Sequence, residues 1–145
     1  MLYFDTSFLA PLILEEPTSA GIESFIAKLP AGQLYISHWT RVEFSSLISR
    51  EVRMGGFSEK NALTATGQFD ELVKDSFQVV LPGAADYELA KAYIQRFATK
   101  LRAGDALHLA IASNNGVNTF YTLDEGLLAA ARQLKIRASG KTETR

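Results

Sequence analysis

Four carboxylates lie far apart in this 145-residue sequence, yet each occupies the point where a short apolar run gives way to a helix-like segment: Asp5, Glu43, Asp105 and Asp124. In open α/β sheets, the junctions that follow parallel strands meet in one crevice at the carboxyl edge of the sheet. We therefore expect the four side chains to share one acidic site. Ionised carboxylates at close range repel one another unless a cation balances them, and a hard divalent metal is the natural partner.

Magnesium prefers a few carboxylates, keeps several waters and takes its other ligands from substrate phosphate oxygens. Metal ions held this way activate water and stabilise charge on a scissile phosphate, so the expected reaction is phosphodiester hydrolysis. Asp5, Asp105 and Asp124 are also expected near helix starts, where the helix dipole favours phosphate anions. Ser7 and Thr122 add hydroxyl groups that could orient waters or carboxylates.

Each of these acids also has a purely structural interpretation, because Asp is common at helix N-caps and in first turns. Their joint placement favours a shared function. Asp5 ends an apolar first strand, and Glu43 is expected in the first turn of a helix, beside the apolar Trp39 and Phe44.

Composition limits the remaining classes. The length fits a single domain over residues 1–145, and the absence of cysteine excludes disulfides, thiolate catalysis and cysteine-based metal sites. The only early apolar stretch, residues 8–14, contains Pro11 and follows no basic segment, so neither a signal peptide nor a membrane span is expected. A reducing cytoplasm is compatible with this composition.

The net charge of −1 does not by itself indicate a nucleic-acid binder. A modest basic tail closes the chain, with Lys135, Arg137, Lys141 and Arg145 against Glu143. This tail is consistent with a solvated terminus and equally with a phosphate-contacting segment.

Hydrophobic periodicity predicts short strands alternating with helices. The expected strands cover residues 2–5, 34–36, 77–81 and 119–122, with Ile136 in a short last strand; the expected helices cover 18–29, 39–54, a segment opening at Ser58, 84–97, 103–114 and 124–134. This alternation predicts an α/β domain with a mainly parallel sheet.

Other polar residues carry weaker signals. His38 and His108 lack a partner at metal-ligand spacing, so a structural role is favoured for both, although His108 could approach the site through a hydrogen bond. Arg102 is the favoured phosphate-binding cation because it lies three residues before Asp105.

Four motifs in order resemble the PIN-domain ribonucleases, in particular the VapC-type toxins of toxin–antitoxin pairs. The motifs span nearly the whole chain: Leu2-Tyr3-Phe4-Asp5-Thr6-Ser7, Arg41-Val42-Glu43-Phe44, the run from Arg102 to Ala110, and Thr122-Leu123-Asp124. The resemblance implies a parallel sheet of about five strands sandwiched by helices, and cleavage of RNA with magnesium or manganese. It assigns Asp5, Glu43, Asp105 and Asp124 to the catalytic site, with Asp5, Asp105 and Asp124 holding the metal and Ser7 and Thr122 in support; Arg102 is expected to support them as the phosphate-binding cation.

The same resemblance implies a homodimer, a cognate VapB-type antitoxin and a tRNA, rRNA or mRNA substrate. Two other classes fit poorly. A haloacid-dehalogenase-like phosphatase needs a second Asp where Ser7 stands, and a receiver domain needs an acceptor Asp that residues 77–83 lack. The serious alternative is a non-catalytic PIN-like module that binds RNA or protein.

Overall fold

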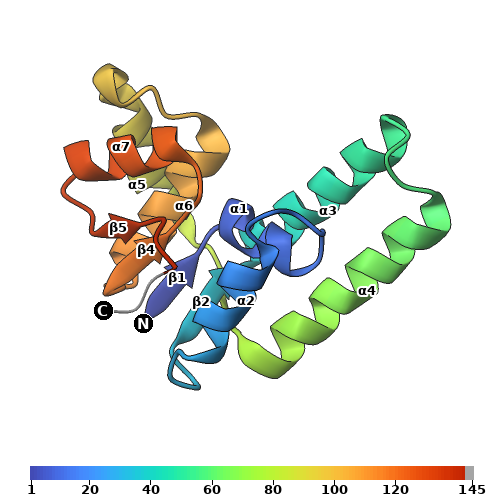
Figure 1. The fold of residues 1–145 in the computed structure, drawn as a ribbon. Helices are drawn as coiled ribbons and strands as arrows, with labels where there is room; N and C mark the ends of the chain where they lie inside the picture. Colours follow the sequence, from blue (N-terminus) through green and yellow to red (C-terminus); the bar gives the residue numbers. More distant parts are fainter. Residues whose placement is uncertain (143–145) are drawn as a thin grey trace.

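A five-stranded parallel sheet forms the centre of the computed structural model, which describes residues 1–142 (Figure 1). The strand order is β3-β2-β1-β4-β5, and every pairing is parallel. The strands are β1 (Leu2–Phe4), β2 (Leu34–Ser37), β3 (Gln78–Val80), β4 (Thr119–Tyr121) and β5 (Ala138–Ser139). The predicted α/β class with a parallel sheet of about five strands is confirmed.

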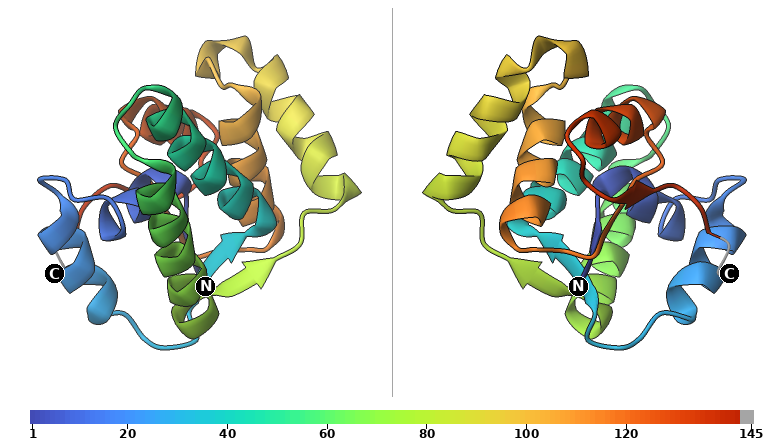
Figure 2. Two further views of the ribbon diagram at one scale, coloured as in Figure 1. Left: turned by 90° about the vertical axis from the view of Figure 1, so that its right-hand side faces the viewer. Right: turned by 90° about the vertical axis from the view of Figure 1, so that its left-hand side faces the viewer.

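Helices cover both faces of this sheet (Figure 2). Within the described residues they are α1 (Thr6–Leu9), α2 (Ser19–Ala27), α3 (His38–Arg53), α4 (Glu59–Ser76), α5 (Ala84–Gln95), α6 (Ala103–Asn114) and α7 (Glu125–Gln133), with short 3-10 turns η1 (Ala10–Leu12) and η2 (Phe97–Thr99). Helices α3 and α4 form a long antiparallel pair that projects from the rest of the molecule (Figure 1). The stacked rings of Phe44 and Phe69, with centroids 3.9 Å apart, join the two helices.

The alternation of side chains along the strands divides the core in two. Phe4 points to the face covered by α1 to α4, and its neighbour Tyr3 points to the face covered by α5 to α7. Tyr3 stacks on Phe120 of β4, while Phe4 stacks on Tyr121. Burying these rings on both faces fixes β1 at the middle of the sheet, so Asp5, directly after β1, lies at the centre of its carboxyl edge.

The order of the strands creates the crevice. From β1 the sheet continues to β2 and β3 on one side, and to β4 and β5 on the other. Such a switch point is where ligands bind in open parallel sheets. The segments that leave β1, β2 and β4 begin helices there, and each helix has a side-chain cap: Asp5 for α1, Ser37 for α3 and Asp124 for α7.

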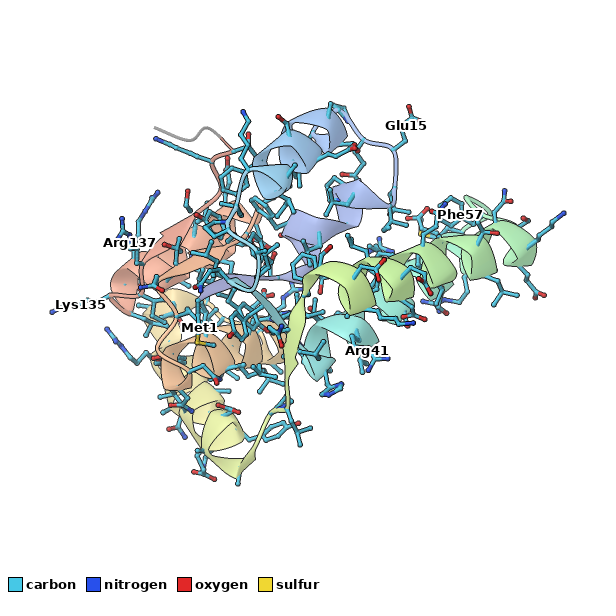
Figure 3. All side chains as sticks on the ribbon, turned by 90° about the horizontal axis from the view of Figure 1, so that it is seen from below. Met1, Glu15, Arg41, Phe57, Lys135 and Arg137 are labelled. Carbon is cyan, nitrogen blue, oxygen red and sulfur yellow. The ribbon has the colours of Figure 1, made fainter. Side chains whose placement is uncertain are left out.

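Several predicted boundaries shift. Helix α3 begins at His38 because Ser37 and Thr40 form a capping box, which places Glu43 in the second turn and not in the first. The last strand pairs with β4 at Ala138 and Ser139, so the placement of Ile136 in it was wrong. Lys135 and Arg137 of the basic tail lie in the segment before β5, and their side chains extend outward (Figure 3). Glu143 and Arg145 lie outside the described residues.

None of the helices in residues 1–142 combines the length and apolarity needed to cross a membrane.

A buried carboxylate away from the carboxyl edge supplies the first prediction. Asp86 accepts hydrogen bonds from the Gly83 amide at 2.8 Å and from Asn114 Nδ2 at 2.9 Å, and so ties the start of α5 to the end of α6. We expect Asp86→Ala to lower the free energy of unfolding by about 2 kcal/mol, because two hydrogen bonds to a buried carboxylate are lost. Urea unfolding of Asp86→Ala, Asn114→Ala and the double variant measures the coupling. If the losses in the free energy of unfolding of the two single variants add up in the double variant, the hydrogen bond between Asp86 and Asn114 does not couple the two helices.

Candidate functional site

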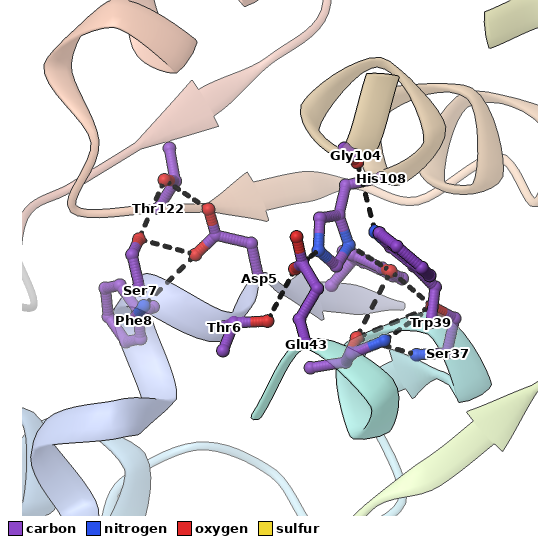
Figure 4. A network of polar contacts seen from close by, with 12 residues as sticks. Asp5, Thr6, Ser7, Phe8, Ser37, Trp39, Glu43, Gly104, His108 and Thr122 are labelled. Atoms are coloured by element: carbon purple, nitrogen blue, oxygen red, sulfur yellow. Dashed lines mark hydrogen bonds and ion pairs between the residues drawn. The ribbon is translucent and has the colours of Figure 1, made fainter. Parts of the chain in front are cut away.

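Asp5 lies at the centre of the site, where β1 ends and α1 begins, and it is 3% exposed (Figure 4). Its Oδ1 accepts from the Ser7 hydroxyl at 2.7 Å and from the Phe8 amide at 3.1 Å, and its Oδ2 accepts from the Thr122 hydroxyl at 2.5 Å. Ser7 and Thr122 also contact each other at 3.1 Å. Both predicted supporting residues therefore lie against Asp5, and they join β1 to the end of β4.

Glu43 reaches the same edge from α3. Its Oε1 accepts from the Thr6 hydroxyl at 2.7 Å and lies in short contact with Nε2 of His108 on α6. The other ring nitrogen of His108, Nδ1, is 2.7 Å from the hydroxyl of Tyr3. Because a carboxylate only accepts, Nε2 carries the proton toward Glu43, and in the neutral ring Nδ1 accepts from Tyr3. A continuous buried network therefore fixes the position of Glu43 (Figure 4).

Asp105 and Asp124 line a neighbouring cleft of about 440 Å³ together with Arg102. Asp105 lies in the first turn of α6, as predicted. Asp124 caps α7 by accepting from the Leu127 amide at 3.0 Å, and its own amide donates to the Thr122 hydroxyl at 3.0 Å. Thr122 thus connects the Asp5 network with the Asp124 side of the cleft.

Burial and neighbouring charges shift the pKa values of three of these acids. Burial, together with the nearby carboxylates of Asp124 and Glu43 and the more distant Asp5, raises the pKa of Asp105 to about 6. Burial also raises the pKa of Asp5, against the lowering effect of His108 and of its hydroxyl donors. Burial of Glu43 is outweighed by the hydrogen bond and charge of His108, so its pKa is lowered. Glu43 therefore stays ionised, whereas repulsion from neighbouring carboxylates disfavours the ionised form of Asp105.

A metal was predicted on Asp5, Asp105 and Asp124. In the part of the chain described, no three His, Asp or Glu side chains converge closely enough to make a ready-made metal cage. Magnesium retains several waters and needs only a few carboxylates, so a ready-made cage is not required. The donors are all oxygens, and Asp5 Oδ2, which accepts a hydrogen bond from Thr122, keeps a further lone pair. The chemistry of the donor set fits a hard divalent cation.

Gly104 allows α6 to approach α3 closely. A Cβ at this position would lie 3.0 Å from Glu43 Oε2 and 3.2 Å from the Trp39 ring. Trp39 Nε1 donates to the Gly104 carbonyl at 3.2 Å, which anchors the indole against the first turn of α6. The glycine therefore brings Glu43 within range of the Asp105 carboxylate.

Sequence reasoning found the support of Glu43 only in part. A structural role was favoured for His108, with a hydrogen bond to the site as the alternative, and the residue is 1% exposed and contacts Glu43 directly. Thr6 and Tyr3 were not singled out. The available signal was a polar histidine on the otherwise apolar face of α6, where a buried polar group requires partners. His38, by contrast, is exposed, and within residues 1–142 its ring is hydrogen-bonded to Arg41.

The PIN domain family model matches residues 2–133, so the chain belongs to the PIN domain family. No curated protein matches the sequence.

Solved structures of toxins and of toxin–antitoxin complexes share the fold. The sarcin–ricin loop cleaving toxin VapC20 of Mycobacterium tuberculosis superimposes with a TM-score of 0.72 at 20% identity, over 90% of this chain and 95% of that chain. FitAB bound to a DNA fragment gives 0.75 at 16% identity, over 100% and 98%. VapBC2 of Rickettsia felis, bound to a DNA fragment from its promoter, gives 0.65 at 14% identity, over 96% and 98%. At these identities the likeness shows a common fold.

Proposed function

We propose that the chain, acting as one domain over residues 1–145, is a VapC-type toxin that hydrolyses RNA phosphodiester bonds with Mg²⁺ or Mn²⁺. The observation that carries this proposal is the placement of the acids at one edge of the sheet: Thr122 joins Asp5 to Asp124, and Asp124 and Asp105 line one cleft. Carboxylates gathered at a sheet switch point balance their repulsion best by sharing a cation. Membership in the PIN domain family supports the same conclusion.

Asp5, Asp105 and Asp124 would hold the cation. When bound, it would supply Lewis-acid activation of water and of the scissile phosphate. Glu43, ionised and fixed by Thr6 and His108, would accept a proton from the attacking water and orient it.

The remaining groups keep these acids in place and bind the substrate. Ser7 and Thr122 hold both oxygens of Asp5 in one orientation, which fixes where the free lone pair of Oδ2 points. Arg102, exposed in the cleft beside Asp105, would pair with an RNA phosphate.

Partners follow from the same proposal. VapC20 is described as a toxin that cleaves the sarcin–ricin loop, and a similar structure from Klebsiella pneumoniae is described as a toxin–antitoxin complex. We propose an RNA substrate, whether tRNA, rRNA or mRNA, together with a cognate VapB-type antitoxin, a homodimer and a cytoplasmic location. The alternative, a non-catalytic PIN-like binding module, draws support from the lack of a ready-made metal cage in the described residues.

Inducible expression in a bacterial host separates these two functions. The wild type should arrest growth and generate new RNA 5′ ends, whereas Asp5→Asn should do neither. Asp70→Asn makes the same chemical change on the exposed side of α4 and serves as the matched control. Equal arrest by wild type and Asp5→Asn, without new RNA ends, would favour the binding module.

The support of Glu43 supplies a further prediction. We expect His108→Leu to lower cleavage by about 10- to 100-fold, because the partner that orients a site carboxylate is lost. It should also lower the free energy of unfolding by about 2 kcal/mol, since Glu43 and Tyr3 lose a buried partner. His108→Gln can still donate to Glu43, so part of the activity should return.

Cleavage rates and urea unfolding of His108→Leu and His108→Gln measure both effects. His38→Gln is the control, because His38 is exposed and contacts Arg41 only. Full activity in His108→Leu would show that Glu43 does not depend on this network.

A further inference from the structure

The cleft beside Asp105 and Asp124 combines acids with cations. It has a volume of about 440 Å³, and its wall includes Lys100 and Arg102 from the segment between η2 and α6, opposite residues of α7. A larger cavity of about 570 Å³ lies between α5, α6 and Trp39, but its lining is mainly apolar and Lys91 is the one charged residue among it. The smaller cleft is therefore the one whose chemistry suits an anion near the acidic site.

The two cations are not neutralised by the acids that share their cleft. In residues 1–142 the one ion pair joins His108 to Glu43. Lys100 and Arg102 are both exposed. Arg102 occupies the N-cap position of α6, and a guanidinium cannot accept from the amides of the first turn, so its donors are not used in capping. Its place at the positive end of the α6 dipole adds to the local attraction for anions.

The backbone at Lys100 gives an independent argument. Lys100 adopts the left-handed conformation, with φ of 57° and ψ of 26°, which costs a residue with a side chain of the order of 1 kcal/mol relative to glycine. The turn is fixed by the buried hydroxyl of Thr99, which donates to the Arg96 carbonyl at 2.8 Å and accepts from the Leu101 amide at 3.4 Å. Glycine or asparagine would suit this turn better than lysine.

A lysine held in such a turn points to a use for its charge. We propose that Lys100 and Arg102 bind a second backbone phosphate of the RNA substrate, the neighbour of the phosphate that is cleaved. The inference rests on the proposed nuclease function and names its substrate contact. The cations lie beside the acids, so they hold the strand while the acids act on the next phosphate.

Substrates with one neutral phosphate test the contact directly. A methylphosphonate is placed at each position in turn around the cleavage site of a mapped RNA oligonucleotide. In the wild type, substitution at one position next to the cleaved bond should raise KM by about tenfold, as expected for loss of one charge-assisted contact, and leave kcat nearly unchanged.

The variant Lys100→Asn, Arg102→Gln should show the same rise in KM on unmodified RNA and no further rise with that methylphosphonate. Asn tolerates the left-handed turn, so this variant should fold. Lys91→Gln, in the apolar cavity, and Lys60→Gln, on α4, are matched controls that keep the full methylphosphonate effect. A methylphosphonate penalty that persists in full in the double variant would overturn the proposal.

Binding without cleavage distinguishes this inference from the nuclease function itself. Oligonucleotide affinity is measured by fluorescence anisotropy at several salt concentrations, in the Asp5→Asn background. The slope of log affinity against log salt concentration should fall in magnitude by about one unit for each of the two cations that is replaced. If the slope is unchanged when Lys100→Asn and Arg102→Gln are added to Asp5→Asn, the phosphate contact is refuted even if the wild type cuts RNA. A reduced slope without any RNA cleavage in the wild type would keep the contact and refute only the nuclease function.

Discussion

Asp105→Asn is expected to lower RNA cleavage by at least about 100-fold, because it removes a charged ligand of the proposed cation. The same change should stabilise the metal-free protein. Burial and the carboxylates of Asp124, Glu43 and Asp5 raise the pKa of Asp105 to about 6 from its ordinary value of 3.8. Holding this group ionised therefore costs folding energy, which an uncharged amide of the same shape avoids.

The pH dependence of this effect has a definite sign. The folded state holds the Asp105 proton up to about pH 6, whereas the unfolded chain releases it near 3.8, so the penalty grows between these values as the pH rises. Since the group is partly exposed, we expect Asp105→Asn to raise the free energy of unfolding by about 1 kcal/mol at about pH 8 and by almost nothing at about pH 4.

Urea unfolding in EDTA at the two pH values, with Asp70→Asn as control, measures this difference. Added Mg²⁺ should stabilise the wild type more than Asp105→Asn, because the cation binds the folded wild type. A variant that is destabilised equally at both pH values would show that Asp105 acts as an ordinary structural polar residue.

Asp5 should show the largest contrast between two substitutions at one position. Asp5→Ala removes the acceptor of Ser7, Thr122 and the Phe8 amide, all at a buried point where β1, α1 and β4 meet. We expect a loss of about 3 kcal/mol in the free energy of unfolding, because three donors lose their partner. Asp5→Asn keeps one acceptor oxygen, and the hydroxyls can turn to accept from its amide.

Asp5→Asn should therefore stay within about 1 kcal/mol of the wild type, helped because burial already raises the pKa of the native carboxyl. It should nevertheless cleave RNA at least about 100-fold more slowly, since the charge that holds the cation is gone. Thermal unfolding and cleavage assays on both variants test this separation of stability from activity. If Asp5→Asn cleaves RNA normally, Asp5 serves only to cap α1 and to accept hydrogen bonds from its neighbours.

The sequence predicted the parts of the site that leave local signals. Asp5 and Asp124 each follow a short apolar strand and each caps a helix, so strand, cap and helix could be predicted from neighbouring residues. The helix over residues 103–114 was also predicted at its observed bounds, with Asp105 in its first turn. These features depend on capping and periodicity, which act within a few residues.

The contacts between distant elements could not be predicted in the same way. His108 meets Glu43 across 65 positions of sequence, and Tyr3 meets His108 across 105. These contacts arise because β1 lies between β2 and β4, an order that no local pattern encodes. The last strand was misplaced for the same reason, since only its hydrogen bonds to β4 define it.

The most direct test of the central claim is cleavage of total cellular RNA by the purified protein, in Mg²⁺ or Mn²⁺ and in EDTA, beside folded Asp5→Asn, with mapping of the RNA ends. We predict discrete cuts that require the metal and disappear in EDTA and in Asp5→Asn. Cuts that persist in EDTA, or are equal in Asp5→Asn, would contradict the proposed carboxylate site. Folded wild-type protein that makes no cuts in any of the RNA would contradict the nuclease function and favour a binding module.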